Sequence, residues 1–471
     1  MAIRISVVGV GLDTYWPQFP GLRQRLRDCQ TRLAADLEVP GAQVGDLGLV
    51  DSVSAARAAA AAARAAGTEL LVVWLSTYAL SGTILPLVQE CGCPVVVAAL
   101  QPTAAPDIAA INALGDRGAM TGAWLGYCQA CSAPEVANVF RRAGIALRLV
   151  AGHLASESDV GRVRSWVSAA VARARLRNAT IGALGGIYDG MLDIQTDITA
   201  LAACLGSRFR CLEFSRLEAA RAACTEQDIA AAAEDLARRF RVDPACAPGE
   251  LRRAAATAAA IERLVAAEGL SALAYYYEGR DGGSDRDLVT SLIPGMTRMT
   301  GMGVPCAGEY EIKNAVAMLI MQLIGTGGSF SEFYAADFDR DEILLGHDGP
   351  GHPALAAEDV AVVPLPVYHG KPGQGLSIAM RVRPGPVTLL SVVQHPGLTA
   401  FVVAEGEAVA GATLAIGNTN SRYRFACSAR DFIERWSAAG PAHHTAIGPG
   451  RHAEAIARLA DLVGVTVVRV G

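Results

Sequence analysis

Hydrophobic residues in the first third of the chain fall into short runs that alternate with helical stretches. Predominantly apolar runs at residues 4–12, 68–76 and 93–100 have the length of buried strands. The intervening residues 20–37 and 54–67 have helical character, and the second of these stretches is rich in alanine. Continuous apolar strands separated by helices predict a parallel sheet that helices cover on both faces. Ligands bind such sheets at the carboxyl ends of the strands.

The pattern changes twice further along the chain. Residues 156–178 form a long helical stretch that leads into a second α/β region, which begins with a strand at residue 179. From about residue 328 the periodicity is that of strands separated by turn-forming residues, including runs at 398–409 and 412–427. This last pattern predicts an antiparallel barrel or sandwich.

We therefore predict an α/β fold of two Rossmann-like, doubly wound α/β domains followed by a β-rich, antiparallel barrel-like C-terminal domain. The predicted boundaries are residues 1–155 for the N-terminal domain, 156–327 for the central domain and 328–471 for the β-rich domain. A chain of 471 residues is too long for one ordinary hydrophobic core, which agrees with several domains.

The composition narrows the class of protein. With 52% hydrophobic and 18% charged residues the chain is typical of a globular protein, and its net charge of -5 argues against a nucleic-acid partner. The apolar run at the N-terminus is too short for a signal peptide, and no run is long enough for a membrane span, so a cytoplasmic location is expected. The eleven cysteines do not suggest a disulfide framework. Cys128 and Cys131 lack the second pair that a zinc site needs, which favours a structural role.

Three glutamates lie where a carboxylate needs an explanation. Glu309 and Glu311 precede a strongly apolar helix in "EYEIKNAVAMLIMQLIG". A carboxylate at a helix N-terminus is ordinarily a cap, but a core-buried helix would carry this carboxylate deep into the molecule, where it needs a cation. Glu332 lies in the aromatic segment "FSEFY" and must either face solvent or have a partner.

Histidines in two turns complete a candidate metal site. His347 ends the strand-like "EILLGH", and His443 and His444 lie in "GPAHHTAIG". A turn histidine alone is more often a hydrogen-bonding residue. Two carboxylates with two imidazoles, however, suit Mn²⁺, with Mg²⁺, Co²⁺ or Fe²⁺ as substitutes.

These segments resemble motifs of L-arabinose isomerase, in the same order along the chain. "PGMTRMTGMGVPCAGEYEIKNA" is similar to the family's segment with a metal-binding glutamate and a lysine four residues later, and "FSEFY" is similar to its F-x-E-x-Y motif. "LLGHDG" resembles its glycine-preceded histidine and "GPAHHTAIG" its H-H-T turn. The metal ligands implied by this resemblance are Glu309, Glu332, His347 and His444. Glu309 is preferred over Glu311 because it keeps the family's spacing to the lysine.

The resemblance also implies a fold, an assembly and a reaction. The wider L-fucose/L-arabinose isomerase group resembles the three-domain plan predicted above, and its members are homo-oligomers with active sites between subunits, so a hexamer or trimer is expected. Its chemistry is aldose–ketose isomerisation through an enediolate that the metal stabilises. Glu309 and Glu332 would be the acid/base pair, and which of them is the first base stays open.

The loops of the first domain depart from that family. The family has a glutamine and a histidine where this chain has Leu12 and Asp13, and a histidine where it has Ser76. The expected substrate is therefore a pentose, a 6-deoxyhexose or a related sugar. The residues expected to bind it are Asp13, Tyr15, Trp16, Ser76, Tyr78, His443 and His352.

Two other functions remain open from the sequence. The same metal–enediolate site could perform epimerisation or C–C cleavage. A non-catalytic sugar-binding protein could also keep this fold, although such a binder would have no use for the full set of ligands.

Overall fold

The structure is a computed structural model that describes residues 2–187, 189–276, 284–368 and 371–471. It folds into two compact units, residues 1–174 and 175–471. The predicted fold class is confirmed, since parallel-sheet α/β parts precede a β-rich C-terminal part. The predicted three-domain boundaries stay a prediction. Among the described residues, no helix combines the length and apolar composition needed to cross a membrane.

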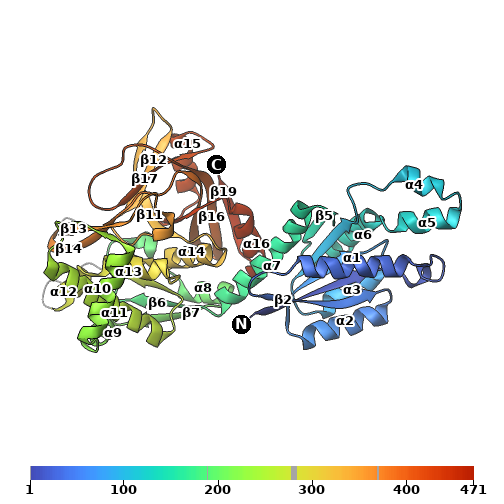
Figure 1. Ribbon diagram of the computed structural model, residues 1–471, viewed down its shortest axis with the longest axis horizontal. Coiled ribbons are helices and arrows are strands. Elements are labelled where there is room, and N and C mark those ends of the chain that lie inside the picture. The colour runs from blue at the N-terminus through green and yellow to red at the C-terminus, as the bar shows by residue number, and fades with distance from the viewer. Residues whose placement is uncertain (1, 188, 277–283, 369–370) are drawn as a thin grey trace. The chain divides into compact units, whose positions relative to one another are not determined.

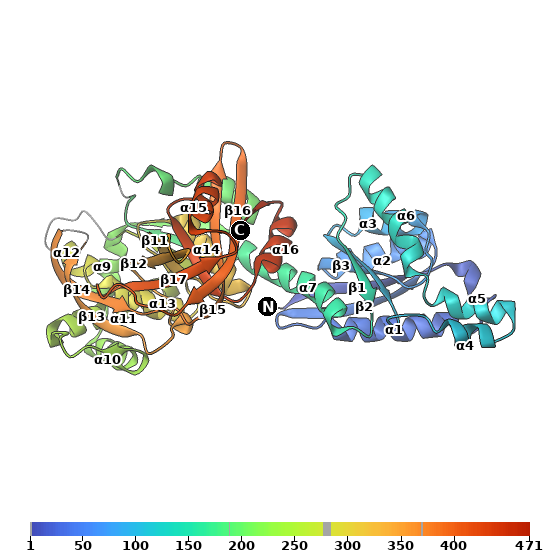
Figure 2. The same cartoon turned by 90° about the horizontal axis from the view of Figure 1, so that it is seen from above.

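The first unit is built on a fully parallel sheet in the order β2-β1-β3-β4-β5. Its strands are β1 Ile3–Val10, β2 Ala42–Val50, β3 Thr68–Leu75, β4 Val95–Gln101 and β5 Leu149–His153. Helices lie on both faces, as Figure 2 shows: α2, α3 and α6 share one core with the sheet, and α1 lies on the other side. The helices are α1 Leu22–Asp36, α2 Val53–Ala65, α3 Ser81–Glu90, α4 Ile108–Ala113, α5 Arg117–Leu125, α6 Gln129–Arg142 and α7 Glu157–Arg177.

The second unit begins with a smaller parallel sheet in the order β10-β9-β6-β7. Its strands are β6 Thr180–Leu184, β7 Arg208–Leu212, β9 Ala272–Tyr275 and β10 Cys306–Ala307. Helices α9, α11 and α13 pack together beside this sheet (Figure 1). The helices of this part are α8 Ile198–Leu205, α9 Phe214–Ala222, α10 Glu226–Arg239, α11 Pro248–Glu268, α12 Ser284–Val289 and α13 Leu292–Gly301.

The remainder of the second unit is a closed antiparallel barrel. Its strands follow the ring order β15-β18-β11-β12-β17-β16, and pairing of β16 with β15 closes the ring. The strands are β11 Ser329–Asp337, β12 Glu342–His347, β15 Gly385–His395, β16 Leu398–Val409, β17 Thr419–Phe425 and β18 His444–Pro449. Closure removes the exposed strand edges that an open sheet would present. Strand β19, Thr466–Val470, adds in parallel to β16, and α15 Ala429–Ala438 and α16 Ala453–Val463 complete this part.

A small sheet in the order β14-β13-β8 links the barrel region to the α/β part. It consists of β8 Arg241–Val242, β13 Ala361–Tyr368 and β14 Lys371–Ala379.

The buried helix expected from the sequence is α14, Ile312–Leu323. It contacts β6, β9 and β10 of the parallel sheet and also β11, β15 and β18 of the barrel, so it lies between the two (Figure 1). Each of its residues from Ile312 to Met321 is buried. Because both sides of this helix are covered, its continuous apolar run, residues 315–321, fits it better than an amphipathic pattern would. Its N-terminus therefore opens in the interior, where the carboxyl end of β10 meets the barrel strands.

Candidate metal centre

Strand register brings two of the candidate ligands together. Glu332 in β11 is paired with His444 in β18 on one side and with Gly346 in β12 on the other. Directly paired residues of antiparallel strands have their side chains on the same face, about 5 Å apart at Cβ. His347 immediately follows Gly346, at the end of β12. Residues more than a hundred positions apart thus meet at one end of the barrel.

Glu309 reaches the same place from the connection between β10 and α14. Its carboxylate lies 3.6 Å from His347 Nε2, 3.5 Å from His443 Nε2 and 3.2 Å from His444 Nε2. The backbone here is unusual, because Glu309 and Tyr310 have φ angles of 55° and 59°. This left-handed conformation costs an L-residue roughly 1–2 kcal/mol, and such strain is concentrated at functional sites.

Among the described residues, two groups have the spacing to hold a metal ion. One contains Glu309, His347 and His444, and the other contains Glu332, His443 and His444, with the ligand atoms of each group within 4.8 Å of one another. The Phe330 ring covers this cluster, with its centroid 4.2 Å from the His347 ring and 4.5 Å from the His444 ring. The four ligands predicted from sequence are therefore neighbours, and His443 is a fifth candidate.

Buried imidazole nitrogens without hydrogen bonds make this cluster suitable for a divalent cation. His444 is fully buried, and within the described residues neither of its ring nitrogens forms a hydrogen bond of acceptable geometry. The Nδ1 atom of His347 is in the same state. A buried polar atom without a hydrogen bond costs about 1–3 kcal/mol, and an ion bound at His444 Nε2 would remove that cost. Carboxylate oxygen and imidazole nitrogen are ligand atoms that coordinate Mn²⁺ and similar divalent cations.

The electrostatics of the cluster are dominated by Glu309. Burial disfavours its carboxylate, but contacts with His347, His443 and His444 outweigh burial and hold the pKa of Glu309 below its ordinary range. Burial lowers the pKa of His347. Burial also opposes protonation of His443, but the Glu309 and Asp193 carboxylates raise its pKa to about 9. Glu309 and Glu311 likewise raise the pKa of His444 against the effect of burial.

The Glu311 carboxylate lies on the Nδ1 side of His444. The spacing to Lys313 made Glu311 the second choice, after Glu309, as a metal ligand. Glu311 is the N-cap residue of α14 and makes no side-chain cap hydrogen bond. Its fully buried carboxylate lies 3.6 Å from His444 Nδ1 and 3.5 Å from Lys313 Nζ. A carboxylate behind a ligating imidazole commonly fixes which ring nitrogen faces the metal. The capping interpretation thus explains this residue less well than a supporting role for His444.

The predicted sugar-binding residues of the first unit follow the carboxyl ends of its strands. Asp13 and Tyr15 lie on a short 3-10 helix after β1, and Trp16 Nε1 donates to Asp51 at 2.7 Å. Ser76 is buried and donates to the carbonyl of Val10. Their role in binding stays a prediction, as does that of Tyr78.

Tyr78 and the cysteine pair that the sequence predicts to be structural both lie beside helix α6 of the first unit. The Tyr78 hydroxyl bonds Glu135 of α6 at 3.1 Å. Cys128 is the N-cap residue of α6, and its Sγ lies 3.0 Å from that of Cys131. Both are free thiols. Both contacts are compatible with a structural role for these residues.

His352 lies in a structural hydrogen-bond network. Its Nδ1 accepts from Ala354 N at 3.2 Å, its backbone N–H donates to Ser329 Oγ, and Nε2 faces Gln322 at 3.5 Å. These contacts link the turn after β12 to the end of α14. The predicted role in sugar binding is not tested by them.

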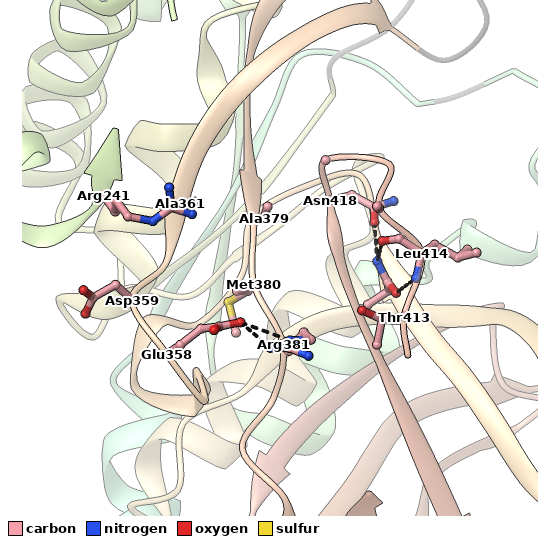
Figure 3. Close-up of a pocket in the computed structure, with 13 residues that line it drawn as sticks. Arg241, Glu358, Asp359, Ala361, Ala379, Met380, Arg381, Thr413, Leu414 and Asn418 are labelled. Atoms are coloured by element: carbon pink, nitrogen blue, oxygen red, sulfur yellow. Dashed lines mark hydrogen bonds and ion pairs between the residues drawn. The ribbon is translucent and has the colours of Figure 1, made fainter. Parts of the chain in front are cut away.

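A separate pocket of about 390 Å³ opens beside the barrel (Figure 3). None of the candidate ligands lines it. Its charged walls include the Glu358–Arg381 ion pair, and Asn420 holds the Leu414 backbone on its other side. Asn418, also in its wall, donates to the Tyr334 hydroxyl at 2.8 Å. The pocket therefore adjoins the β11 strand without being the metal site.

The comparison with protein families finds a match in the barrel region. Residues 327–466 match the family model of the L-arabinose isomerase C-terminal domain, and this range contains Glu332, His347 and His444. An L-arabinose isomerase from Nocardioides sp. is 25% identical over 352 residues, which cover 71% of this chain and 68% of that protein. A solved structure of a conserved domain protein from Vibrio cholerae covers 67% of this chain and 77% of its own at 12% identity. Its TM-score of 0.17 is too low to support an argument about the fold.

Proposed function

Because the chain is a divergent L-arabinose isomerase-like protein, we propose that it is a sugar isomerase that interconverts an aldose and its ketose. The substrate class we propose is a pentose, a 6-deoxyhexose or a related sugar. The observation that carries the proposal is the convergence of three imidazoles on the Glu309 carboxylate, with Glu332 at the rim of the same cluster. Such a set of donors is suited to a divalent cation and to proton transfer.

The proposed metal ligands are Glu309, Glu332, His347 and His444, and Mn²⁺ is the proposed ion. A bound divalent ion would supply Lewis-acid polarisation of adjacent sugar oxygens. The protein's own contribution is to fix the donors: the β11–β18 register sets Glu332 and His444, and the strained turn before α14 sets Glu309. Phe330 shields the imidazoles from water.

We propose that Glu332 and Glu309 share the proton chemistry unequally. Glu309 is held ionised by three imidazoles, and a carboxylate with a lowered pKa is a weak base. The Glu332 side chain is 30% exposed, against 6% for Glu309. Its carboxylate lies 3.9 Å from His443 Nε2, compared with 3.5 Å for the Glu309 carboxylate. Glu332 is therefore the better placed group to remove the proton from the carbon next to the sugar carbonyl, with Glu309 completing the pair.

The assembly we propose is a homo-oligomer, a hexamer or a trimer, with active sites between subunits. This part of the proposal rests on the resemblance to the L-fucose/L-arabinose isomerase group.

The first test is elemental analysis of the purified protein, together with a Mn²⁺-dependent isomerisation screen across aldopentoses and 6-deoxyhexoses. We expect near-stoichiometric metal and turnover of at least one sugar. Glu332→Gln should lower turnover at least about 100-fold and weaken Mn²⁺ binding while the fold is retained. Glu234→Gln, an exposed residue of α10, is the matched control and should behave as wild type.

Other outcomes would count against the proposal. Unchanged turnover in Glu332→Gln would remove this residue from the mechanism. Retained metal without turnover of any aldose would favour another reaction at the site. Failure to bind Mn²⁺ at all would leave the glutamates and histidines as a structural cluster.

A further inference from the structure

A short turn far from the barrel in sequence makes a close contact with His443. Asp193 lies in the 3-10 helix Leu192–Ile194, after β6. Its Oδ2 atom is 2.6 Å from His443 Nδ1 and accepts a hydrogen bond from the His443 backbone N–H at 3.0 Å. One carboxylate oxygen thus holds both the backbone and the ring of a residue 250 positions away.

This contact determines which nitrogen of His443 faces the cluster. With a carboxylate at Nδ1, that nitrogen carries the hydrogen, and Nε2 is directed elsewhere. Nε2 lies 3.5 Å from Glu309 and 3.9 Å from Glu332. The Asp193 contact therefore sets the direction of the imidazole.

Lys313 holds the turn that carries Asp193. Its ammonium group donates to the backbone carbonyls of Asp193, at 2.7 Å, and of Gln195, at 3.0 Å. Lys313 is one of only two lysines in the chain, is 4% exposed, and lies in the first turn of α14 next to Glu311. Because the buried Lys313 ammonium group donates both of these hydrogen bonds to one turn, it restrains that turn relative to α14.

Stability alone does not account for the Asp193–His443 pair. The side chains are 42% and 36% exposed, respectively, and ion pairs at such exposure contribute little to folding. An exposed histidine without an anchor would populate several rotamers. The main consequence of the contact is therefore the fixed orientation of the His443 ring.

We propose that Asp193 is a positioning residue, which aims His443 Nε2 into the space beside Glu309 and Glu332 so that it hydrogen-bonds a hydroxyl group of an open-chain sugar. Lys313 keeps the Asp193 turn in place. This inference rests on the proposed isomerase function for its substrate. It places His443 outside the metal-ligand set, although its spacing would also allow ligation.

The experiment compares Asp193→Asn, His443→Asn, the double variant, Asp193→Glu and Lys313→Met. Asp189→Asn, an exposed residue four positions from Asp193, is the matched control for changes to the turn. Steady-state kinetics are measured on the Mn²⁺-loaded enzyme with the best aldose of the screen, and Mn²⁺ affinity is measured by calorimetry. Selective ¹⁵N-histidine labelling reports the hydrogen-bonded Nδ1–H of His443 by NMR, independently of turnover.

We expect Asp193→Asn and His443→Asn each to raise KM about tenfold, the loss of one hydrogen bond to the substrate, with kcat within about threefold. The double variant should match His443→Asn, because Asp193 acts through His443. Asp193→Glu should recover part of the loss, and Lys313→Met should share it. Mn²⁺ affinity should stay within about twofold of wild type in Asp193→Asn. The Nδ1–H signal should disappear in Asp193→Asn and persist in Asp189→Asn.

Three results would overturn the inference. A double variant clearly worse than His443→Asn would mean that Asp193 acts on something else. A fall in Mn²⁺ affinity beyond about tenfold in Asp193→Asn would make His443 a metal ligand. An Nδ1–H signal unchanged in Asp193→Asn would deny the positioning contact itself. If wild type turns over no aldose, the proposed function fails separately, and the NMR signal still decides the contact.

Discussion

Glu311 is a residue whose position has no ordinary explanation. Its carboxylate has no exposure, and it lies between His444 Nδ1 and Lys313 Nζ at 3.6 and 3.5 Å. Burying a charge is costly unless it is paired, and here the pairing is with the back of a proposed metal ligand. Supporting carboxylates of this kind orient a ligating imidazole.

We therefore expect Glu311→Gln to weaken Mn²⁺ binding about 10–100-fold, because His444 loses the carboxylate that orients it. Calorimetric titration of the metal-free protein measures the affinity, and circular dichroism checks that the fold is retained. Glu234→Gln serves again as the exposed control. A Mn²⁺ affinity equal to wild type would reduce Glu311 to a partner of Lys313 alone.

For single residues, the sequence predicts only those roles that a short local motif indicates. Glu332, His347 and His444 each lie in a motif of a few residues, and the resemblance of these motifs to those of L-arabinose isomerase is what singles them out; their role as metal ligands stays a prediction. The same is not true of Asp193, because its contact with His443 spans 250 positions and is made by a turn without periodicity. The roles of Glu311 and Asp193 depend on tertiary packing, which no spacing rule expresses.

At the scale of elements, the β12–β17 pairing controls where His347 lies. The His347 backbone N–H donates to Thr419 Oγ1 at 3.1 Å, and the Thr419 hydroxyl donates to the His347 carbonyl at 3.0 Å. The preceding Gly346 allows this close approach: a Cβ there would clash with the Thr419 carbonyl oxygen and lie 2.8 Å from Asn420 Cα. Both are backbone atoms, which cannot rotate away.

Gly346→Ala should therefore separate the two strands. We expect a loss of at least about 2 kcal/mol of stability, typical of overpacking, together with weaker Mn²⁺ binding because His347 moves with the strand. Urea denaturation and metal titration measure the two effects. Gly349→Ala is a less suitable comparison because it too lies near His347, whereas Gly186→Ala, with open space at its Cβ, is the matched control. Wild-type stability in Gly346→Ala would contradict the tight pairing.

A buried ion cluster ties three helices of the second unit together. Arg298 of α13 is 7% exposed and pairs with Asp235 of α10 and with Glu262 of α11. Burial would raise the pKa of Asp235, but Arg298 and Arg239 outweigh it and lower that pKa. A lowered carboxyl pKa contributes stability above the unfolded-state value, and this contribution is lost as the pH falls through the folded-state pKa.

Asp235→Asn should accordingly destabilise the protein by about 3–5 kcal/mol at pH 7, since it leaves Arg298 buried with less compensation. The difference from wild type should shrink as the pH falls below about 4, where the wild-type carboxyl also becomes neutral. Urea unfolding at several pH values measures it, with the exposed Asp339→Asn as control. A difference that does not change with pH would assign the loss to packing rather than charge.

The sequence predicts the type of a secondary-structure element best where that element is buried on all sides. The continuous apolar run of α14 predicted a helix covered on all sides, and the structure has one. The strand expected at 412–427 is shorter, because β17 begins only at Thr419. The reason is local: the Asn420 side chain bonds the backbone N–H and carbonyl of Leu414 at 2.8 and 2.9 Å, which holds the preceding residues as a loop. Side-chain to backbone bonds of this kind compete with strand pairing.

At the scale of the whole molecule, the candidate residues are divided between the two units. The proposed metal ligands, with Glu311, Asp193 and Lys313, all lie in residues 175–471, whereas Asp13, Tyr15 and Tyr78 lie in residues 1–174. The hydrophobic periodicity predicted both the parallel sheet and the antiparallel barrel. It could not show to which subunit's active site a loop contributes, because that depends on how subunits associate. The proposed oligomer, with active sites between subunits, would bring the two sets of residues together.

Mixing two inactive variants tests that arrangement. Glu332→Gln damages only the second unit and Asp13→Asn only the first. If each site combines the first unit of one subunit with the second unit of another, random hetero-oligomers made from equal amounts of both variants contain about a quarter of intact sites. Unfolding and refolding the mixture together, followed by assay of the aldose identified in the screen, should then recover about that fraction of wild-type activity.

The controls fix what the result means. Each variant refolded alone should stay inactive, and the Mn²⁺ affinity of Asp13→Asn should equal that of wild type, because its metal ligands are untouched. Full activity of Asp13→Asn alone would remove this loop residue from the reaction, and Tyr15→Phe or Tyr78→Phe would take its place in the mixture. Absence of recovery, with wild-type chains refolding to active oligomers, would mean that each subunit completes its own site.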